Sequence, residues 1–143
     1  MRVVQTFEVS LKAFIVRDGR ALLVREADTG FWELPGGRID IGEEQLAHEA
    51  ILARELAEEL GPGFQVTTTA SALSFWRQRP GDGVFQIIVA RVCRHVAGEP
   101  RLSAEHAGHV WAEPAAWAAL QFPPLSDYPA ALARLGGLAF DDL

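Results

Sequence analysis

The stretch of sequence that decides the fold runs from residue 34 to residue 61 and reads LPGGRIDIGEEQLAHEAILARELAEELG. Near the start of this stretch, the turn-forming run Pro35-Gly36-Gly37 is expected to end the preceding strand. From Glu44 to Leu60 the chain has no proline or glycine and is rich in alanine, leucine and glutamate, and Gly61 then stops the run. The stretch therefore predicts a short strand, a glycine turn and one long helix from Glu44 to Leu60.

Three glutamates share one face of this predicted helix. Glu55, Glu58 and Glu59 are spaced by three and four residues, which places them within roughly a hundred degrees of the helix surface. The residues on the opposite side are apolar: Ala53, Leu56, Ala57 and Leu60. Like charges at such spacings cost a few tenths of a kcal/mol per pair. The face is therefore either an acidic surface in water or a cluster whose repulsion a cation such as magnesium offsets.

The order of residues around the helix resembles the Nudix box, G-x5-E-x7-R-E-U-x-E-E-x-G-U, in which U is aliphatic. Gly37 and Glu43 match its first part, and the run from Arg54 to Gly61 matches its second. On these residues the chain is identified as a member of the Nudix hydrolase family, with a MutT-like domain. Ten residues separate Glu43 from Arg54 where the family has seven, and Pro62 stands where an aliphatic residue is usual. The three extra residues either lengthen the first turn of the helix or are absorbed in the loop, which leaves the role of Glu43 open.

The resemblance implies a magnesium site, with manganese as a substitute. Its ligands would be Glu55, Glu58 and Glu59 with the backbone carbonyl of Gly37 or a neighbour, or one of the glutamates orients the attacking water instead. Arg54 lies four residues before Glu58 and either fixes its rotamer by pairing with it or meets a phosphate directly.

The same resemblance suggests further catalytic and substrate-binding residues. Glu105 matches the loop carboxylate that serves several family members as general base; otherwise it is an ordinary exposed carboxylate. Gly36 and Gly37 either let the backbone approach metal or phosphate closely or simply form the turn before the helix. Arginines are candidates for binding phosphates and aromatic rings for stacking on a base, the alternatives being solvated arginines and core aromatics. These candidates are Arg25, Arg38, Arg77, Trp32, Phe75, Trp76 and Phe85.

The remaining sequence predicts a sheet with helices after it. Alternating apolar residues from Phe7 to Val16, a turn at Asp18-Gly19 and the run from Ala21 to Val24 predict a β-hairpin. Further strands are expected at 31–34, 64–76, 84–92 and 108–111, and helices at 114–120 and 127–135. This order indicates an α/β fold, and the resemblance specifies the Nudix α/β/α sandwich with a mixed parallel and antiparallel sheet.

Length and composition limit the function. The 143 residues, about half of them apolar, suit one domain spanning 1–143. Thirteen basic against nineteen acidic residues, with Lys12 the only lysine, do not predict binding to a nucleic acid polymer. No apolar run predicts a membrane span, so we expect a cytoplasmic protein. The lone Cys93 cannot form an internal disulfide and is expected to be a core residue.

We therefore expect a magnesium-dependent hydrolase that cleaves the diphosphate bond of a nucleoside diphosphate linked to another moiety. Its partner would be a small-molecule nucleotide, and a homodimer is common among such enzymes. The alternative is a non-catalytic Nudix-like sensor domain that binds a nucleotide or sugar phosphate. The retained carboxylates favour the enzyme, and no second motif selects the substrate.

Overall fold

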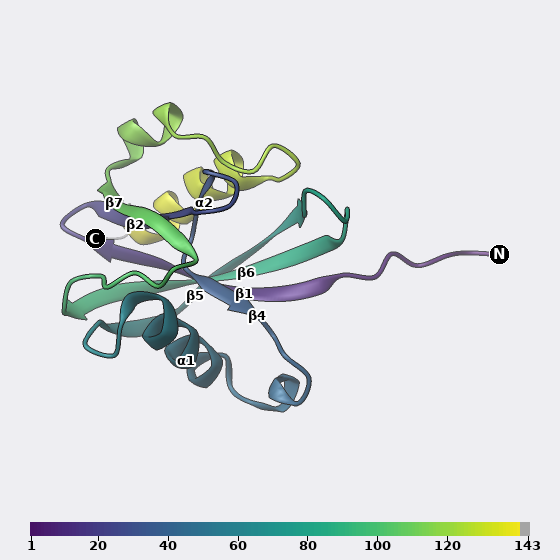
Figure 1. Cartoon of the computed structure of the whole chain (residues 1–143), viewed down its shortest axis with the longest axis horizontal. Coiled ribbons are helices and arrows are strands. Elements are labelled where there is room, and N and C mark those ends of the chain that lie inside the picture. The colour runs from purple at the N-terminus through teal and green to yellow at the C-terminus, as the bar shows by residue number, and fades with distance from the viewer. Residues whose placement is uncertain (141–143) are drawn as a thin grey trace.

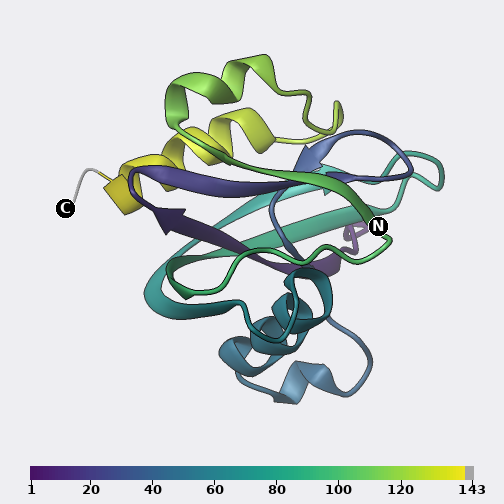
Figure 2. The same ribbon diagram turned by 60° about the vertical axis from the view of Figure 1, so that its left-hand side comes forward.

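The computed structural model describes residues 1–140. Its elements in chain order are β1 (Glu8–Arg17), β2 (Arg20–Glu26), β3 (Trp32–Glu33), β4 (Gly36–Arg38), the 3-10 helix η1 (Glu43–Gln45), α1 (His48–Leu60), β5 (Gln65–Gln78), β6 (Phe85–Ala97), β7 (His106–Ala112), the 3-10 helix η2 (Pro114–Ala119) and α2 (Tyr128–Phe140). The elements form a sheet with helices on both of its faces: α1 covers one, and η2 and α2 cover the other (Figures 1 and 2). The predicted α/β/α sandwich is confirmed.

The sheet is mixed, as predicted. Its main order is β3-β2-β1-β6-β5, with β4 paired to β1 and β7 paired to β2. The pairing of β1 with β6 is parallel, and the other strand pairs are antiparallel. The predicted hairpin corresponds to β1 and β2. The strand β1 lies at the centre of the sheet, where it contacts β2, β4 and β6.

Two hydrophobic clusters fill the space between the sheet and its helices. Leu11, Ala13 and Ile15 of β1 face the cluster beneath α1, and Phe14 faces the cluster beneath α2. Successive side chains of a strand point to opposite faces, so a central strand of a sandwich is buried on both. Cys93 is fully buried in the α1 cluster.

The helix predicted from Glu44 begins later than expected. Residues 43–45 form the 3-10 turn η1, Leu46 is extended, and α1 starts at His48 after an extended cap at Ala47. The left-handed conformation of Gly42 and the extended backbone of Leu46 and Ala47 interrupt helical hydrogen bonding, although the local composition favours a helix. The three extra residues are therefore absorbed in the segment before α1. Of the apolar residues opposite the glutamates, Leu56 and Leu60 are buried, whereas Ala53 and Ala57 are exposed.

The two C-terminal helices also differ from the prediction. The segment after Pro114 is a 3-10 helix, and α2 continues to Phe140 instead of ending at Leu135. The predicted helix ended before two glycines. Gly136 is buried and packs against the Trp117 ring, so this tertiary contact stabilises the helix there.

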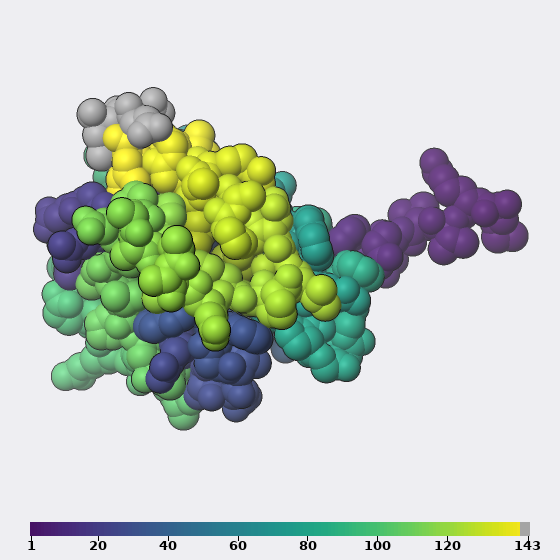
Figure 3. Space-filling view, turned by 90° about the horizontal axis from the view of Figure 1, so that it is seen from above, coloured from purple at the N-terminus to yellow at the C-terminus, as the bar shows by residue number. Residues whose placement is uncertain are grey.

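Residues 1–7 precede the first strand and project from the domain (Figures 1 and 3). Within residues 1–140, no helix combines the length and apolar character needed to cross a membrane.

Candidate functional site

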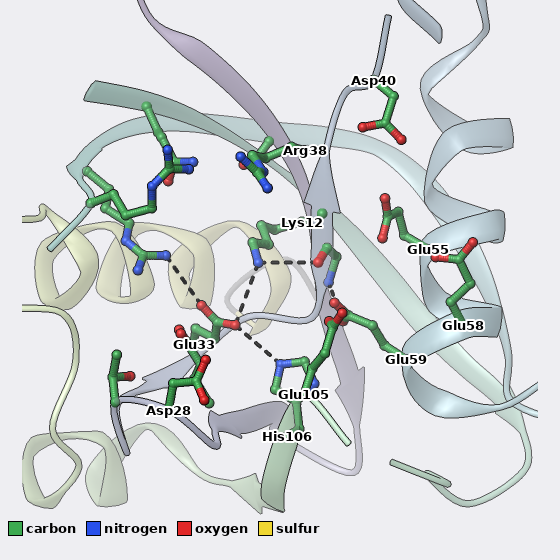
Figure 4. Close-up of a pocket in the computed structure, with 18 of the residues that line it drawn as sticks. Lys12, Asp28, Glu33, Arg38, Asp40, Glu55, Glu58, Glu59, Glu105 and His106 are labelled. Atoms are coloured by element: carbon green, nitrogen blue, oxygen red, sulfur yellow. Dashed lines mark hydrogen bonds and ion pairs between the residues drawn. The ribbon is translucent and has the colours of Figure 1, made fainter. Parts of the chain in front are cut away.

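A cavity of about 730 Å³ lies against α1, β4, the central strand β1 and the end of β5. Its volume suits a nucleotide-sized ligand. Figure 4 shows Glu55, Glu58 and Glu59 of α1 along one side of the cavity. Lys12 and Arg38 lie across the cavity from Glu55, and Glu105 lies lower in this view. Residues far apart in sequence therefore meet in one hollow.

Arg54 connects the glutamates of the box. Its Nε lies 3.0 Å from Glu43 Oε2, while its terminal nitrogens lie 3.0 Å from Glu55 Oε1 and 3.1 Å from Glu58 Oε1. A hydrogen bond from the Asp40 backbone N–H and then the bonds from Arg54 lower the pKa of Glu43. Glu43 does not line the cavity, so its contact with the site passes through Arg54.

Gly36 and Gly37, which were predicted to form a turn, instead lie in β4, where they pair with β1 and pack directly against two of these carboxylates. The Gly36 backbone N–H donates a hydrogen bond of 2.9 Å to Glu59 Oε2. A Cβ on Gly37 would collide with the Glu55 carboxylate, and one on Gly36 would collide with the Leu11 carbonyl oxygen. Gly36 also has a positive φ of 134°. Glycine is required at position 36, where a Cβ would meet the β1 backbone, whereas a Cβ at position 37 would meet only the end of the Glu55 side chain.

Burial disfavours the charged form of two of the α1 carboxylates. Burial raises the pKa of Glu59 to about 7, although Lys12 and the Gly36 N–H oppose the shift. Burial also raises the pKa of Glu55, against the attraction of Arg54. A cation close to these groups would favour their charged forms.

The chemistry of the donor set fits a hard divalent cation, because all three α1 side chains offer carboxylate oxygens. Among residues 1–140, however, no three His, Cys, Asp or Glu side chains already converge closely enough to hold an ion. The reason is visible in the contacts, since Glu55 and Glu58 both face Arg54. Each of them uses only its Oε1 atom in that contact, so binding of a metal would require their other oxygens to converge on the ion.

A buried charge cluster, which the sequence analysis missed, centres on Glu33. This carboxylate lies 3.4 Å from an Arg77 nitrogen, 3.3 Å from His106 Nε2 and 3.9 Å from Lys12 Nζ. Burial opposes ionisation of Glu33, but Lys12, His106 and Arg77 outweigh it and lower its pKa to about 2. The signal was present in the sequence, because Lys12 and Glu33 are charged residues inside otherwise apolar strand segments.

The structure brings most of the sequence candidates to the cavity. Those that line it are Gly36, Gly37, Arg38, Arg54, Glu55, Glu58, Glu59, Arg77 and Glu105. It does not bring the aromatic candidates or Arg25 there. The Arg25 guanidinium lies 5.9 Å from the centre of the Trp32 ring, and Trp32 packs against the core beneath α2.

The other aromatic candidates are also placed away from the cavity. Phe75 packs edge-on against Tyr128, with 4.9 Å between the ring centres, and the ring centre of Phe85 lies 6.2 Å from that of Phe7. Trp76 is 44% exposed and does not line the cavity. Phe75 therefore lies in the core beneath α2, and Trp32 packs against that core, as the alternative of core aromatics describes.

The model of the family described as NUDIX domain matches residues 7–131 of this chain. That match covers most of the sequence, and the chain belongs to the NUDIX family. The family predicted from the box residues is confirmed.

Individual relatives agree with this assignment. A MutT-like protein of Streptomyces ambofaciens is 33% identical over 107 residues, which cover 74% of this chain and 64% of that protein. The chain thus spans just under two thirds of the length of this relative. The solution structure of the E. coli ORF135 protein is 27% identical, with a TM-score of 0.64 over 94% of this chain and 93% of that one. A NUDIX hydrolase from Nitrosomonas europaea has the same fold, with a TM-score of 0.65 at 21% identity over 96% of both chains.

Proposed function

We propose that this domain is a hydrolase that cleaves the diphosphate bond of a nucleoside diphosphate linked to another moiety. The observation that carries the proposal is that the α1 carboxylates meet the two glycines of β4 in the wall of one cavity. There the Glu55 carboxylate occupies the space that a side chain at position 37 would fill. Family membership supports the same reaction class.

Magnesium, with manganese as a substitute, is the cation that the proposal requires. Glu55, Glu58, Glu59 and the Gly37 carbonyl would hold it. When bound, it would supply positive charge to the diphosphate oxygens and make water more acidic.

The chain's own residues would position the reacting groups and accept a proton from the attacking water. Arg54 pairs with both Glu55 and Glu58 through its one guanidinium and therefore acts as a positioning residue for the two carboxylates. The Gly36 N–H fixes one oxygen of Glu59. Glu105 lines the same cavity from the segment before β7 and would take the proton of the attacking water. Arg38 lines the cavity with a largely exposed side chain and would bind a substrate phosphate.

A panel of nucleotide substrates, with magnesium, manganese or EDTA and with mass identification of both products, tests this proposal. We expect metal-dependent release of a nucleoside monophosphate together with the phosphorylated second moiety. Glu58→Gln should lose turnover by about a hundredfold or more while keeping the fold, because a charged ligand becomes a neutral amide. Glu49→Gln is the matched control, since Glu49 lies on the same helix but pairs with Arg91 outside the cavity.

Two outcomes would count against the proposal. Full activity of Glu58→Gln would remove the α1 carboxylates from the reaction. Tight binding of a nucleotide that remains uncleaved after hours with magnesium would favour the alternative of a sensor domain.

A further inference from the structure

Lys12 is the only lysine of the chain, and its side chain is buried on the central strand β1. Successive side chains of a strand point to opposite faces, so Lys12 shares a face with Phe14, two residues further along. Phe14 belongs to the cluster beneath α2. Lys12 therefore reaches the cavity from the face of the sheet opposite α1, and the proposed reaction gives it no role.

Both polar backbone groups of Gly36 are held by side chains, one from each face of the sheet. Lys12 Nζ donates a hydrogen bond of 3.3 Å to the Gly36 carbonyl oxygen, and the Gly36 N–H donates one of 2.9 Å to Glu59 Oε2. Figure 4 shows Lys12 and Glu59 on opposite sides of β4. A buried peptide group needs a partner, and Lys12 supplies the one for this carbonyl.

The bond from Lys12 fixes a peptide plane that would otherwise have more freedom than most. The Gly36 carbonyl lies in the same plane as the Gly37 N–H, and glycines populate more backbone conformations than other residues do. The strand β4 has only three residues, and Gly36 has a positive φ. Gly37 carries the carbonyl that the proposed function assigns to the cation. An anchor on this plane therefore acts on the orientation of that carbonyl.

The ion pair with Glu33 does not account for Lys12 by itself. Lys12 Nζ lies 3.9 Å from Glu33 Oε1, beyond hydrogen-bond distance, whereas its contact with Gly36 is shorter. Glu33 lies closer to Arg77 and to His106, at 3.4 and 3.3 Å. Glu33 therefore keeps a cationic partner when Lys12 is replaced by a neutral residue, and the fold should tolerate that change.

We propose that Lys12 is a positioning residue, which acts on the cation site through the peptide group between Gly36 and Gly37. It works from the face of the sheet opposite the α1 carboxylates, so the site is supported from both sides. This inference rests on the proposed function, because the Gly37 carbonyl is one of the ligands assigned there.

Hydrogen exchange of backbone amides, measured by NMR in EDTA, tests the anchor without a cation. In Lys12→Met the Gly36 and Gly37 amides should exchange at least about tenfold faster than in the wild type, because methionine cannot donate to the carbonyl. The amide of Ile88, which is fully buried in β6, reports the change in global stability and should accelerate less. Lys12→Gln, whose side chain ends one atom short of Nζ, is a second variant with the same expected result.

Glu33→Gln separates the bond from the ion pair. It removes the carboxylate and leaves Lys12 beside the Gly36 carbonyl. Exchange at Gly36 should then accelerate no more than exchange at Ile88. Equal acceleration of Gly36 and Ile88 in both Lys12 variants would overturn the anchor. So would a selective acceleration of Gly36 in Glu33→Gln as large as in Lys12→Met.

Manganese binding, measured by calorimetry, tests the effect on the cation site. Lys12→Met should weaken binding by about tenfold or more, in the range observed for residues that orient metal ligands. Tyr128→Phe is the matched control, because the Tyr128 hydroxyl accepts a hydrogen bond from the Leu34 N–H just before β4 and does not line the cavity. This control should lose stability and keep the wild-type affinity for manganese within about threefold.

The outcomes separate this inference from the proposed function. Selective acceleration of exchange at Gly36 with unchanged manganese affinity in Lys12→Met would overturn the positioning role. A wild type that binds manganese but turns over no substrate would overturn the hydrolase and leave the positioning role standing. A wild type that binds no manganese would overturn both the proposed cation and this role.

Discussion

Replacing Glu33 by glutamine tests the buried charge cluster directly. The residue is 6% exposed, and its carboxylate is the shared partner of Lys12, Arg77 and His106. One pKa unit corresponds to about 1.4 kcal/mol, so a pKa lowered from 4.5 to about 2 represents about 3 kcal/mol of stability. Removal of one partner from a buried ion pair costs a similar amount in other proteins, about 3–5 kcal/mol. We expect Glu33→Gln to lower the free energy of unfolding by about 3 kcal/mol and Tm by roughly 10 °C.

The dependence on pH separates charge from packing. The pKa of Glu33 is lower in the folded than in the unfolded chain, so its contribution is complete above pH 4.5 and is lost as the pH falls toward 2. Glutamine does not titrate. The difference in unfolding free energy between wild type and variant should therefore shrink across this range.

Urea denaturation followed by tryptophan fluorescence, at several pH values from 7 to 3, measures both effects. Glu99→Gln is the control, because Glu99 pairs with Arg17 at 2.9 Å but has a side chain that is 72% exposed. This exposed pair should contribute about 1 kcal/mol or less. A loss below about 1 kcal/mol in Glu33→Gln, or a loss that does not change with pH, would refute the argument from buried charge.

Three further substitutions test the two glycines of β4 and the buried hydroxyl of Tyr128. Gly36→Ala should destabilise the fold by about 2 kcal/mol or more, measured by urea denaturation, because its Cβ would meet the Leu11 backbone at a positive φ. Gly37→Ala should leave Tm within about 5 °C of the wild type but weaken manganese binding in calorimetry, because its Cβ displaces only the Glu55 carboxylate; unchanged manganese affinity would contradict this placement. Tyr128→Phe should cost about 1–2 kcal/mol, because the buried hydroxyl accepts a hydrogen bond from the Leu34 N–H, and a variant as stable as the wild type would show that this bond contributes little.

The strands, the turn and the carboxylate face could be predicted because each depends on neighbouring residues. The hairpin follows from apolar alternation and the Asp18-Gly19 turn, and the spacing of Glu55, Glu58 and Glu59 places them together on any helix that contains them. The helix start could not be predicted this way. Residues 44–47 have a helical composition, but the turn before them and the extended cap at Ala47 exclude them from α1.

The buried charge cluster around Glu33 depends on contacts between distant segments, so local patterns could not reveal it. Lys12 lies on β1 and Arg77 on β5, and the two strands are joined through β6, which runs parallel to β1 and antiparallel to β5. Glu33 reaches the same place from β3, at the edge of the sheet order. Only the strand order brings these three charges together. The same order places Arg25 and Trp32 outside the cavity, although both stand close to the box in sequence.

The spacing within the box carries different information in its two halves. In α1, Arg54, Glu55, Glu58 and Glu59 are fixed relative to one another by helical geometry, so a changed spacing there would rotate a carboxylate away from the cavity. Between Glu43 and Arg54 the chain passes through a 3-10 turn and an extended segment, and a long side chain closes the gap with contacts of 2.7 and 3.0 Å. An insertion in this part changes the loop and leaves the pairing intact. The three extra residues therefore weaken the resemblance of the sequence more than they alter the site.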